Sequence, residues 1–238
     1  MTSTLEDIDT PHSLAPEWMR ARPAVRASAG RKYAAELIGT FFLVFTAGIS
    51  VITHNALAPL GIGAVLVAMI YAGGHISGGH YNPAVTMAVL VRGRIGALDA
   101  VAYWVAQLVG GLLAAAAVAG EARRALTAAP SLSGHAMTTA AVAELLFTFA
   151  LCYVVLNVAT SRDHPANSFY GVAVGFTVAA GVIAVGGVSG GVFNPAITLA
   201  TTVLGLFTWS TLWVYVVVQL VAGAAAGSVF LALNPEDK

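Results

Sequence analysis

Charged residues are scarce in this chain of 238 residues. Only 9% are Asp, Glu, Lys or Arg, against roughly a quarter in an ordinary soluble domain. Hydrophobic residues make up 58%, and the mean hydropathy is +0.82. A chain this short cannot bury so much apolar surface in a water-soluble core, so a soluble domain is excluded. The net charge is zero, so we predict no nucleic-acid partner.

Reactive groups are scarce as well. Cys152 is the single cysteine, which excludes an intrachain disulfide, and its apolar surroundings indicate a packed or lipid-embedded residue. No nucleophile, base and orienting group fall together, so we predict no enzyme, no metal and no cofactor. Residues 1–30 are polar and lack the apolar core of a signal peptide, which predicts a disordered tail.

Long apolar stretches are what the sequence has in abundance. Six of them approach the roughly 20 residues that span a bilayer, at about 33–53, 57–76, 98–120, 138–160, 169–187 and 210–233. Two more, at about 83–91 and 195–205, are too short to cross and predict re-entrant half-helices. The sequence therefore predicts an all-α, multi-pass protein embedded in membrane lipid, with six spans and two half-helices.

The distribution of Lys and Arg predicts the orientation. With six spans both termini share one side, where nine of these residues lie, whereas only Arg123 and Arg124 lie opposite. Cytoplasmic loops carry such an excess, so we expect both termini in the cytoplasm and the chain in the plasma (inner) membrane.

The second half of the sequence repeats the first. AELIGTFFLVF at 35–45 matches AELLFTFALCY at 143–153, and GGHISGGHYNPAVTMA at 73–88 matches GGVSGGVFNPAITLA at 186–200 once one residue is skipped. Each half holds three spans, so the second half inserts upside down and the repeat is inverted. We expect one domain over 31–233, with repeats at about 33–120 and 138–233, and a cytoplasmic tail at 234–238.

Each half also contains one Asn-Pro-Ala triplet: Asn82, Pro83 and Ala84 in the first half, and Asn194, Pro195 and Ala196 in the second. Asparagine is a good N-cap and proline suits the first helical position, so each triplet predicts a helix start. Inversion brings the two starts together near the bilayer midplane. Their dipoles would repel cations there, while side-chain N–H groups held towards a passing water would interrupt proton hopping.

Two such triplets, each preceded by Ser-Gly-Gly and in register with an inverted repeat, resemble the aquaporin (major intrinsic protein) family over residues 33–233. The resemblance implies that family's six-helix, two-half-helix fold and a passive channel for water or other small uncharged solutes. It also implies a homotetramer in which each protomer has its own pore, with Asn82 and Asn194 meeting inside it.

Two acidic residues within the spans, Glu36 and Glu144, occupy equivalent positions of the repeat. One interpretation is a proton relay, which would make the protein a proton-coupled secondary transporter. The favoured interpretation is structural: each carboxylate accepts hydrogen bonds from the irregular backbone of a re-entrant loop, as the matching glutamates of aquaporins do. Gln107 and Gln219, also paired by the repeat, are expected to hydrogen-bond between helices.

The outer constriction that the resemblance implies is unusual. Its positions are Ile62, Val182, Gly191 and Ile197, carried over by their offsets from the two asparagines. The arginine that usually follows the second triplet is replaced by Ile197, so this ring is apolar. Such a ring favours larger or less polar solutes, such as glycerol, hydrogen peroxide, ammonia or a dissolved gas, or else slows water by partial dewetting. No aspartate follows the second triplet, so a glycerol facilitator is not indicated directly.

Overall fold

A computed structural model describes residues 27–125, 132–165 and 167–237, and in these ranges the chain is helical without any strand. The helices are α1 (Ala29–Ile52), α2 (Ala58–Ser77), α3 (Pro83–Val91), α4 (Ala97–Ala125), α5 (Gly134–Ala159), α6 (Tyr170–Ser189), α7 (Pro195–Val203) and α8 (Trp209–Leu233). The predicted tail at 1–30 lies almost wholly outside the described residues, apart from its last residues, where α1 begins.

The predicted division into spans and half-helices is confirmed. Six helices are long and apolar enough to cross a membrane, and α3 and α7, with 9 residues each, are not. The differences lie at the ends: α1 begins at Ala29 rather than 33, and α7 ends at Val203 rather than 205. Apolar content marks the part of a helix inside lipid, whereas hydrogen bonds set where the helix itself begins and ends.

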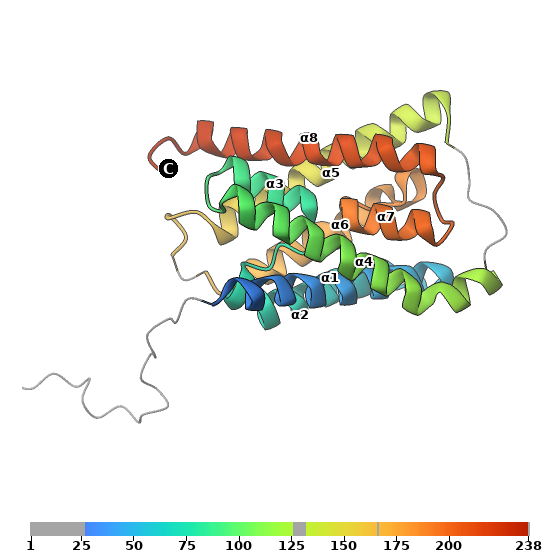
Figure 1. The fold of residues 1–238 in the computed structure, drawn as a ribbon. Coiled ribbons are helices and arrows are strands. Elements are labelled where there is room, and N and C mark those ends of the chain that lie inside the picture. Colours follow the sequence, from blue (N-terminus) through green and yellow to red (C-terminus); the bar gives the residue numbers. More distant parts are fainter. Residues whose placement is uncertain (1–26, 126–131, 166, 238) are drawn as a thin grey trace, which may run out of the picture.

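The inverted repeat is visible in the way the helices pack (Figure 1). Contacts between α1 and α4 are repeated between α5 and α8, and those between α1 and α2 are repeated between α5 and α6. Each half-helix packs on long helices of the other repeat as well as its own: α3 contacts α5 and α8, and α7 contacts α1 and α4. The two repeats are therefore interlocked through their half-helices.

The repeats also meet where α2 crosses α6. A Cβ atom placed on Gly63 would lie 2.7 Å from the carbonyl oxygen of Gly175, a distance that real side chains do not adopt. Glycine at both positions allows the two backbones to touch, as small residues do in other membrane helix pairs. This contact fixes the distance between the two halves beside the re-entrant loops.

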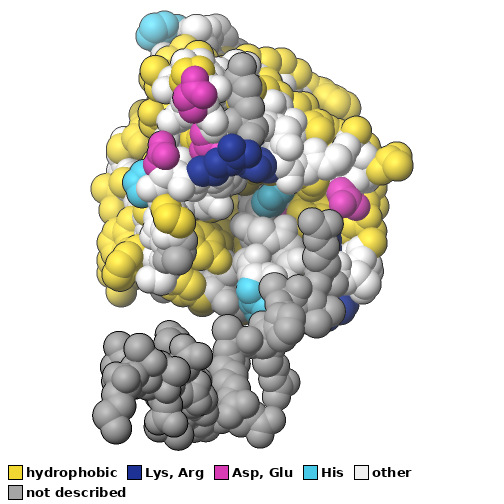
Figure 2. Space-filling model, turned by 90° about the vertical axis from the view of Figure 1, so that its left-hand side faces the viewer, with side chains coloured by type: hydrophobic (Ala, Val, Ile, Leu, Met, Phe, Trp, Pro, Cys, Tyr) yellow, Lys and Arg dark blue, Asp and Glu magenta, His cyan; other side chains and the backbone are white. Residues whose placement is uncertain are grey.

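One end of the bundle is tied by charge. Asp237, just beyond α8, has a carboxylate that pairs with Arg92 at 2.7 Å and with Arg94 at 3.0 Å, and accepts a hydrogen bond from the backbone N–H of Arg162 at 2.9 Å. Figure 2 looks onto this end and shows basic side chains gathered near its centre beside acidic ones. The predicted C-terminal tail at 234–238 is thus packed against the loops after α3 and α5 as far as it is described.

Candidate pore

Both half-helices begin as the triplets predict. Asn82 and Asn194 have extended backbones, and their side-chain oxygens accept hydrogen bonds from the backbone N–H groups of Ala84 and Ala196, at 2.8 and 2.9 Å. Proline follows each asparagine at the first helical position, where the missing N–H leaves no bond unmade. The two helix starts are therefore closely similar in geometry.

The asparagine side chains also join the two loops. Nδ2 of Asn82 donates to the carbonyl oxygen of Phe193, and Nδ2 of Asn194 donates to that of Tyr81, both at 2.9 Å. Tyr81 and Phe193 have φ values of 49° and 50°, a region that costs non-glycine residues energy. This turn presents each carbonyl to the opposite asparagine. The sequence predicted that the asparagines meet but not this crossed pair of bonds.

Each buried glutamate holds the loop of its own repeat. Glu36 accepts hydrogen bonds from the Ser77 hydroxyl, the backbone N–H groups of His80 and Tyr81, and the Gln107 amide, at 2.7 to 2.9 Å. Glu144 accepts the equivalent four bonds from Ser189, Val192, Phe193 and Gln219, over the same range of distances. Both carboxylates are fully buried. Each carboxylate thus accepts four hydrogen bonds.

The two glutamines connect these carboxylates to the half-helices. Gln107 donates to Thr86 as well as to Glu36, and Gln219 donates to Thr198 as well as to Glu144. Each glutamine thus lies between a long helix and the first turn of the half-helix in its own repeat.

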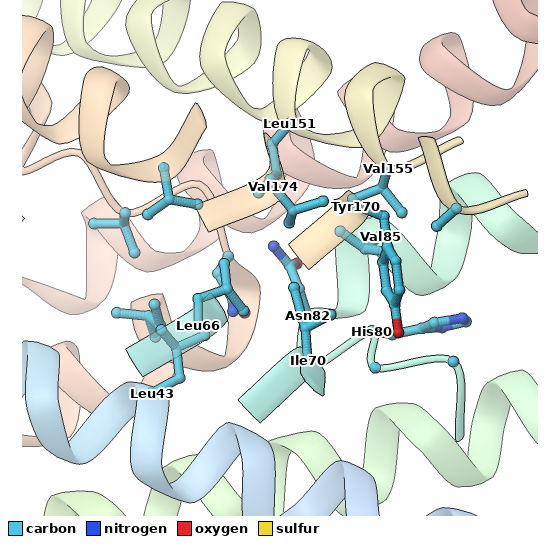
Figure 3. Close-up of a pocket in the computed structure, with 17 residues that line it drawn as sticks. Leu43, Leu66, Ile70, His80, Asn82, Val85, Leu151, Val155, Tyr170 and Val174 are labelled. Atoms are coloured by element: carbon cyan, nitrogen blue, oxygen red, sulfur yellow. The ribbon is translucent and has the colours of Figure 1, made fainter. Parts of the chain in front are cut away.

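A narrow cavity passes between the two helix starts, and Asn82 and Asn194 both line it (Figure 3). On one side of them it is bordered by Gly78, Gly79 and His80 of the first loop and by Tyr170 of α6. We call this side the inner half of the pore; it lies nearer the start of α1 and the end of α8. On the other side, the outer half, the lining is apolar and includes Leu43, Leu66, Leu151, Val178, Val192 and Ile197. Among the described lining residues, side chains other than the asparagines that can form hydrogen bonds therefore lie on the inner side, where Val85 and Val155 add apolar surface.

His80 is fixed by side chains on both sides. Its Nδ1 lies 3.1 Å from the hydroxyl of Thr86, and its ring packs edge-on against Tyr103, with 5.1 Å between the ring centroids. The partner of the imidazole is thus a threonine hydroxyl on the half-helix, and the ring is held beside the cavity.

The predicted constriction residues are only partly brought together. Ile197 lines the cavity, and Val182 touches Gly191, on which a Cβ atom would lie 3.0 Å from the Val182 Cα. Ile62 is buried one turn from Leu66, towards the outer end of α2. Ile62, Val182 and Gly191 are not among the residues that line this cavity.

Several lining residues were not predicted. Leu43 and Leu151 face the cavity from α1 and α5, and Val174 and Tyr170 face it from α6. A signal for the leucines was present: each lies seven residues after a buried glutamate in the matched repeat segments, and therefore on the same helix face. Tyr170 has no matching tyrosine in the other repeat, so the repeat offered no signal for it.

The sequence matches the model of the family described as "Major intrinsic protein" over residues 23–230. The chain belongs to the major intrinsic protein family. It is similar to "Glycerol uptake facilitator protein-like 6" of Lactiplantibacillus plantarum, with 38% identity over 217 residues that cover 87% of this chain and 100% of the relative. It is also similar to "Aquaporin Z" of Photorhabdus laumondii, with 34% identity over 235 residues that cover 87% of this chain and 99% of the relative.

A solved structure, the aquaglyceroporin from Plasmodium falciparum, resembles this fold with a TM-score of 0.73 and 22% identity, covering 85% of this chain and 96% of the other. Members of the major intrinsic protein family are channels rather than enzymes. The protein is therefore an integral, multi-pass membrane channel that passes water or small solutes passively.

Proposed function

We propose that this channel passes small uncharged solutes together with water and excludes protons and ions at its two Asn-Pro-Ala helix starts. The observation that carries the proposal is the pair of asparagines, Asn82 and Asn194, lining one cavity from opposed half-helices. Pro83 with Ala84 and Pro195 with Ala196 supply the first turns of those helices.

Electrostatics supports the exclusion of cations. A helix N-terminus carries the equivalent of roughly half a positive charge, and α3 and α7 direct two of them at the same stretch of the cavity. A cation there meets an unfavourable potential, whereas a neutral molecule does not. The effect is strong because the surroundings are apolar and poorly screened.

Hydrogen bonding supports the exclusion of protons. Each asparagine amide has two N–H donors, of which one is used in the crossed bond to the other loop. The second remains for a molecule in the cavity. A water held by donors from both asparagines has its oxygen occupied and is poorly placed to accept a proton from its neighbour.

The composition of the outer half supports a solute range wider than water. We assign the outer constriction to Ile62, Val182, Gly191 and Ile197, none of which has a side chain that can form hydrogen bonds or carry charge. Water gains nothing there for the hydration it loses, and a less polar solute loses less. The similar relatives are named both for glycerol uptake and as aquaporins, which agrees with a mixed range.

The hydrogen bonds of the glutamates favour a channel over a proton-coupled transporter. Glu36 and Glu144 are saturated by four donors each, and neither lines the cavity. A relay needs a carboxylate that exchanges protons with the lumen. We therefore assign Glu36, Glu144, Gln107 and Gln219 to the support of the loops.

We further propose that the channel is a homotetramer in the plasma (inner) membrane, with both termini in the cytoplasm. The excess of Lys and Arg on the side of the termini supports this orientation. The tetramer and its separate pores come from the resemblance to the aquaporin family.

The test is an osmotic shrinkage assay on proteoliposomes that contain the full chain, comparing water, glycerol, urea and hydrogen peroxide with empty liposomes. We expect water and at least one larger neutral solute to pass, with proton and sodium leaks no larger than those of empty liposomes. A solute flux that depends on a proton gradient in the native protein would establish the transporter instead.

A further inference from the structure

At the inner end of the pore, a tyrosine stands where the cavity meets a second hollow, and the other repeat has no tyrosine at the equivalent position. The cavity between the asparagines adjoins a second hollow, lined by Gly74, Gly78, Val158, Ala159, His164, Asn167 and Tyr170. Gly78, Ala159 and Tyr170 border both spaces. A solute that passes from one space to the other must therefore pass these three residues, of which only the tyrosine is large.

We propose that Tyr170 determines which solutes pass through this channel, according to their size and polarity. It does so at an inner constriction that it forms opposite Gly78 and Ala159. The inference rests on the proposed channel function and locates its selectivity. It assigns to the inner end a discrimination that the apolar outer ring, with Ile197 in place of arginine, is poorly equipped to make.

Tyr170 is held firmly enough to act as a fixed wall. Its ring packs edge-on against Tyr71, with 6.1 Å between the centroids, and the Tyr71 hydroxyl donates to the backbone oxygen of Ser168 at 3.1 Å. The Tyr170 hydroxyl lies over Gly74, where an added Cβ atom would be 2.5 Å from it. Glycine at this position of α2 thus makes the space in which the hydroxyl sits.

The constriction offers polar atoms as well as bulk. Within the described part of the chain the Tyr170 hydroxyl has no hydrogen-bond partner, and Nε2 of His80 has none either, since the Thr86 hydroxyl contacts Nδ1. Figure 3 shows the Tyr170 hydroxyl directed towards the loop that carries His80. A solute at this level therefore meets a hydroxyl and an imidazole nitrogen that are free to bond with it.

The equivalent outer positions lack these groups. Tyr170 and Ala58 each begin the second long helix of their repeat, and His80 and Val192 each lie two residues before an asparagine. The outer end thus has a methyl and an isopropyl group where the inner end has a phenol and an imidazole. The inner end therefore discriminates between solutes more sharply than the outer end, both by their size and by their capacity for hydrogen bonding.

The first test compares Tyr170→Ala with Tyr170→Phe in the shrinkage assay with water, urea and glycerol. We expect Tyr170→Ala to raise the ratio of glycerol to water flux on the order of tenfold, because it widens the passage. Tyr170→Phe keeps the ring and should leave the size limit unchanged while slowing water. Tyr153→Ala is the matched control, because Tyr153 stacks on Phe149 and does not line the cavity.

The second test uses the space over Gly74. Gly74→Ala should push the Tyr170 hydroxyl into the passage and lower the flux of all solutes. Adding Tyr170→Phe should restore the flux, since the nearest remaining ring atom would be 3.5 Å from the new methyl, an ordinary contact. Such a rescue excludes misfolding as the cause of the loss.

Each outcome is decisive. An unchanged glycerol-to-water ratio in Tyr170→Ala, with a conducting native protein, overturns the inner constriction and leaves the channel function standing. A loss in Gly74→Ala that Tyr170→Phe does not restore also contradicts it. A native protein that conducts no better than empty liposomes overturns the proposed function itself.

Discussion

The inner half of the pore has His80 and Tyr170 in its lining in addition to apolar side chains, whereas the described outer lining is apolar, although one repeat builds both. Their supports are alike: Glu36 and Glu144 accept the same four kinds of hydrogen bond, at closely similar distances. Their linings differ, since His80 corresponds to Val192. Positioning two half-helices requires a buried acceptor in each repeat, whereas selectivity requires a polar group at only one level.

The same contrast appears where the half-helices end. Arg92 caps α3, stacks its guanidinium on Phe230 at 4.2 Å and pairs with Asp237, whereas Leu204 caps α7 at the equivalent place. The inner end is thus fastened by charge and the outer end by apolar contact. Substitutions at equivalent positions of the two repeats can therefore distinguish residues that hold the half-helices in place, whose effects should be alike, from residues that line the pore, whose effects should differ.

The largest effect is expected from Glu36→Gln and Glu144→Gln. Each replaces a four-donor acceptor with an amide that brings its own donors, so buried N–H and hydroxyl groups lose their partner. Breaking a buried charged interaction costs about 3–5 kcal/mol of folding free energy, and we expect nearly equal losses at the two positions. Thermal unfolding in detergent measures them, with Glu236→Gln, an exposed position, as control. A clearly unequal pair of losses would break the equivalence of the two supports.

Next in size are Asn82→Asp and Asn194→Asp. Each removes a crossed bond, either to Phe193 or to Tyr81, and adds a negative charge between the helix starts. We expect the sodium leak of proteoliposomes to rise on the order of tenfold in both variants, since about 1.4 kcal/mol of barrier gives that factor. Asn157→Asp on α5, outside the cavity lining, should leave the leak unchanged. An unchanged leak in both test variants would contradict cation exclusion at this level.

A smaller and one-sided effect is expected from adding a hydroxyl to the lining. Val85 and Ile197 occupy equivalent places in α3 and α7, and both line the cavity. Ile197→Thr adds a side-chain hydroxyl to the outer half, whose described lining has none, and should raise water flux several-fold relative to glycerol. Val85→Thr should change this ratio little, because His80 already provides polar atoms on that side. Ile197→Val controls for size, and equal effects of the two threonines would argue against a polar inner half and an apolar outer half.

The sequence predicted the frame of this protein better than its lining. Spans, half-helices and the inverted repeat follow from long apolar runs and matched segments, because lipid leaves few alternatives to a buried helix. The hydrogen bonds of Glu36 also follow, since a buried carboxylate needs donors and the irregular loop supplies them. The crossed asparagine bonds and Tyr170 do not follow, because they depend on where two distant segments touch. Ile62 was placed by helix offset alone, and it is not among the residues that line the described cavity.

The smallest effect on transport is expected from Asp237→Asn, which removes ion pairs at the inner end only. Burial favours the neutral acid, but the backbone N–H of Arg162 and the side chain of Arg92 outweigh it and lower the pKa of Asp237 to about 2. A lowered pKa means that the carboxylate stabilises the fold at neutral pH and that this contribution is lost as pH falls towards 2. The variant should melt lower at pH 7 and show less loss of stability on acidification than the native chain. Asp163→Asn, at an exposed position, serves as control in the same melting series.

The glycerol-to-water flux ratio of Asp237→Asn should stay unchanged, because Asp237 does not line the cavity. A changed ratio would mean that the ion pairs of Asp237 influence the inner lining.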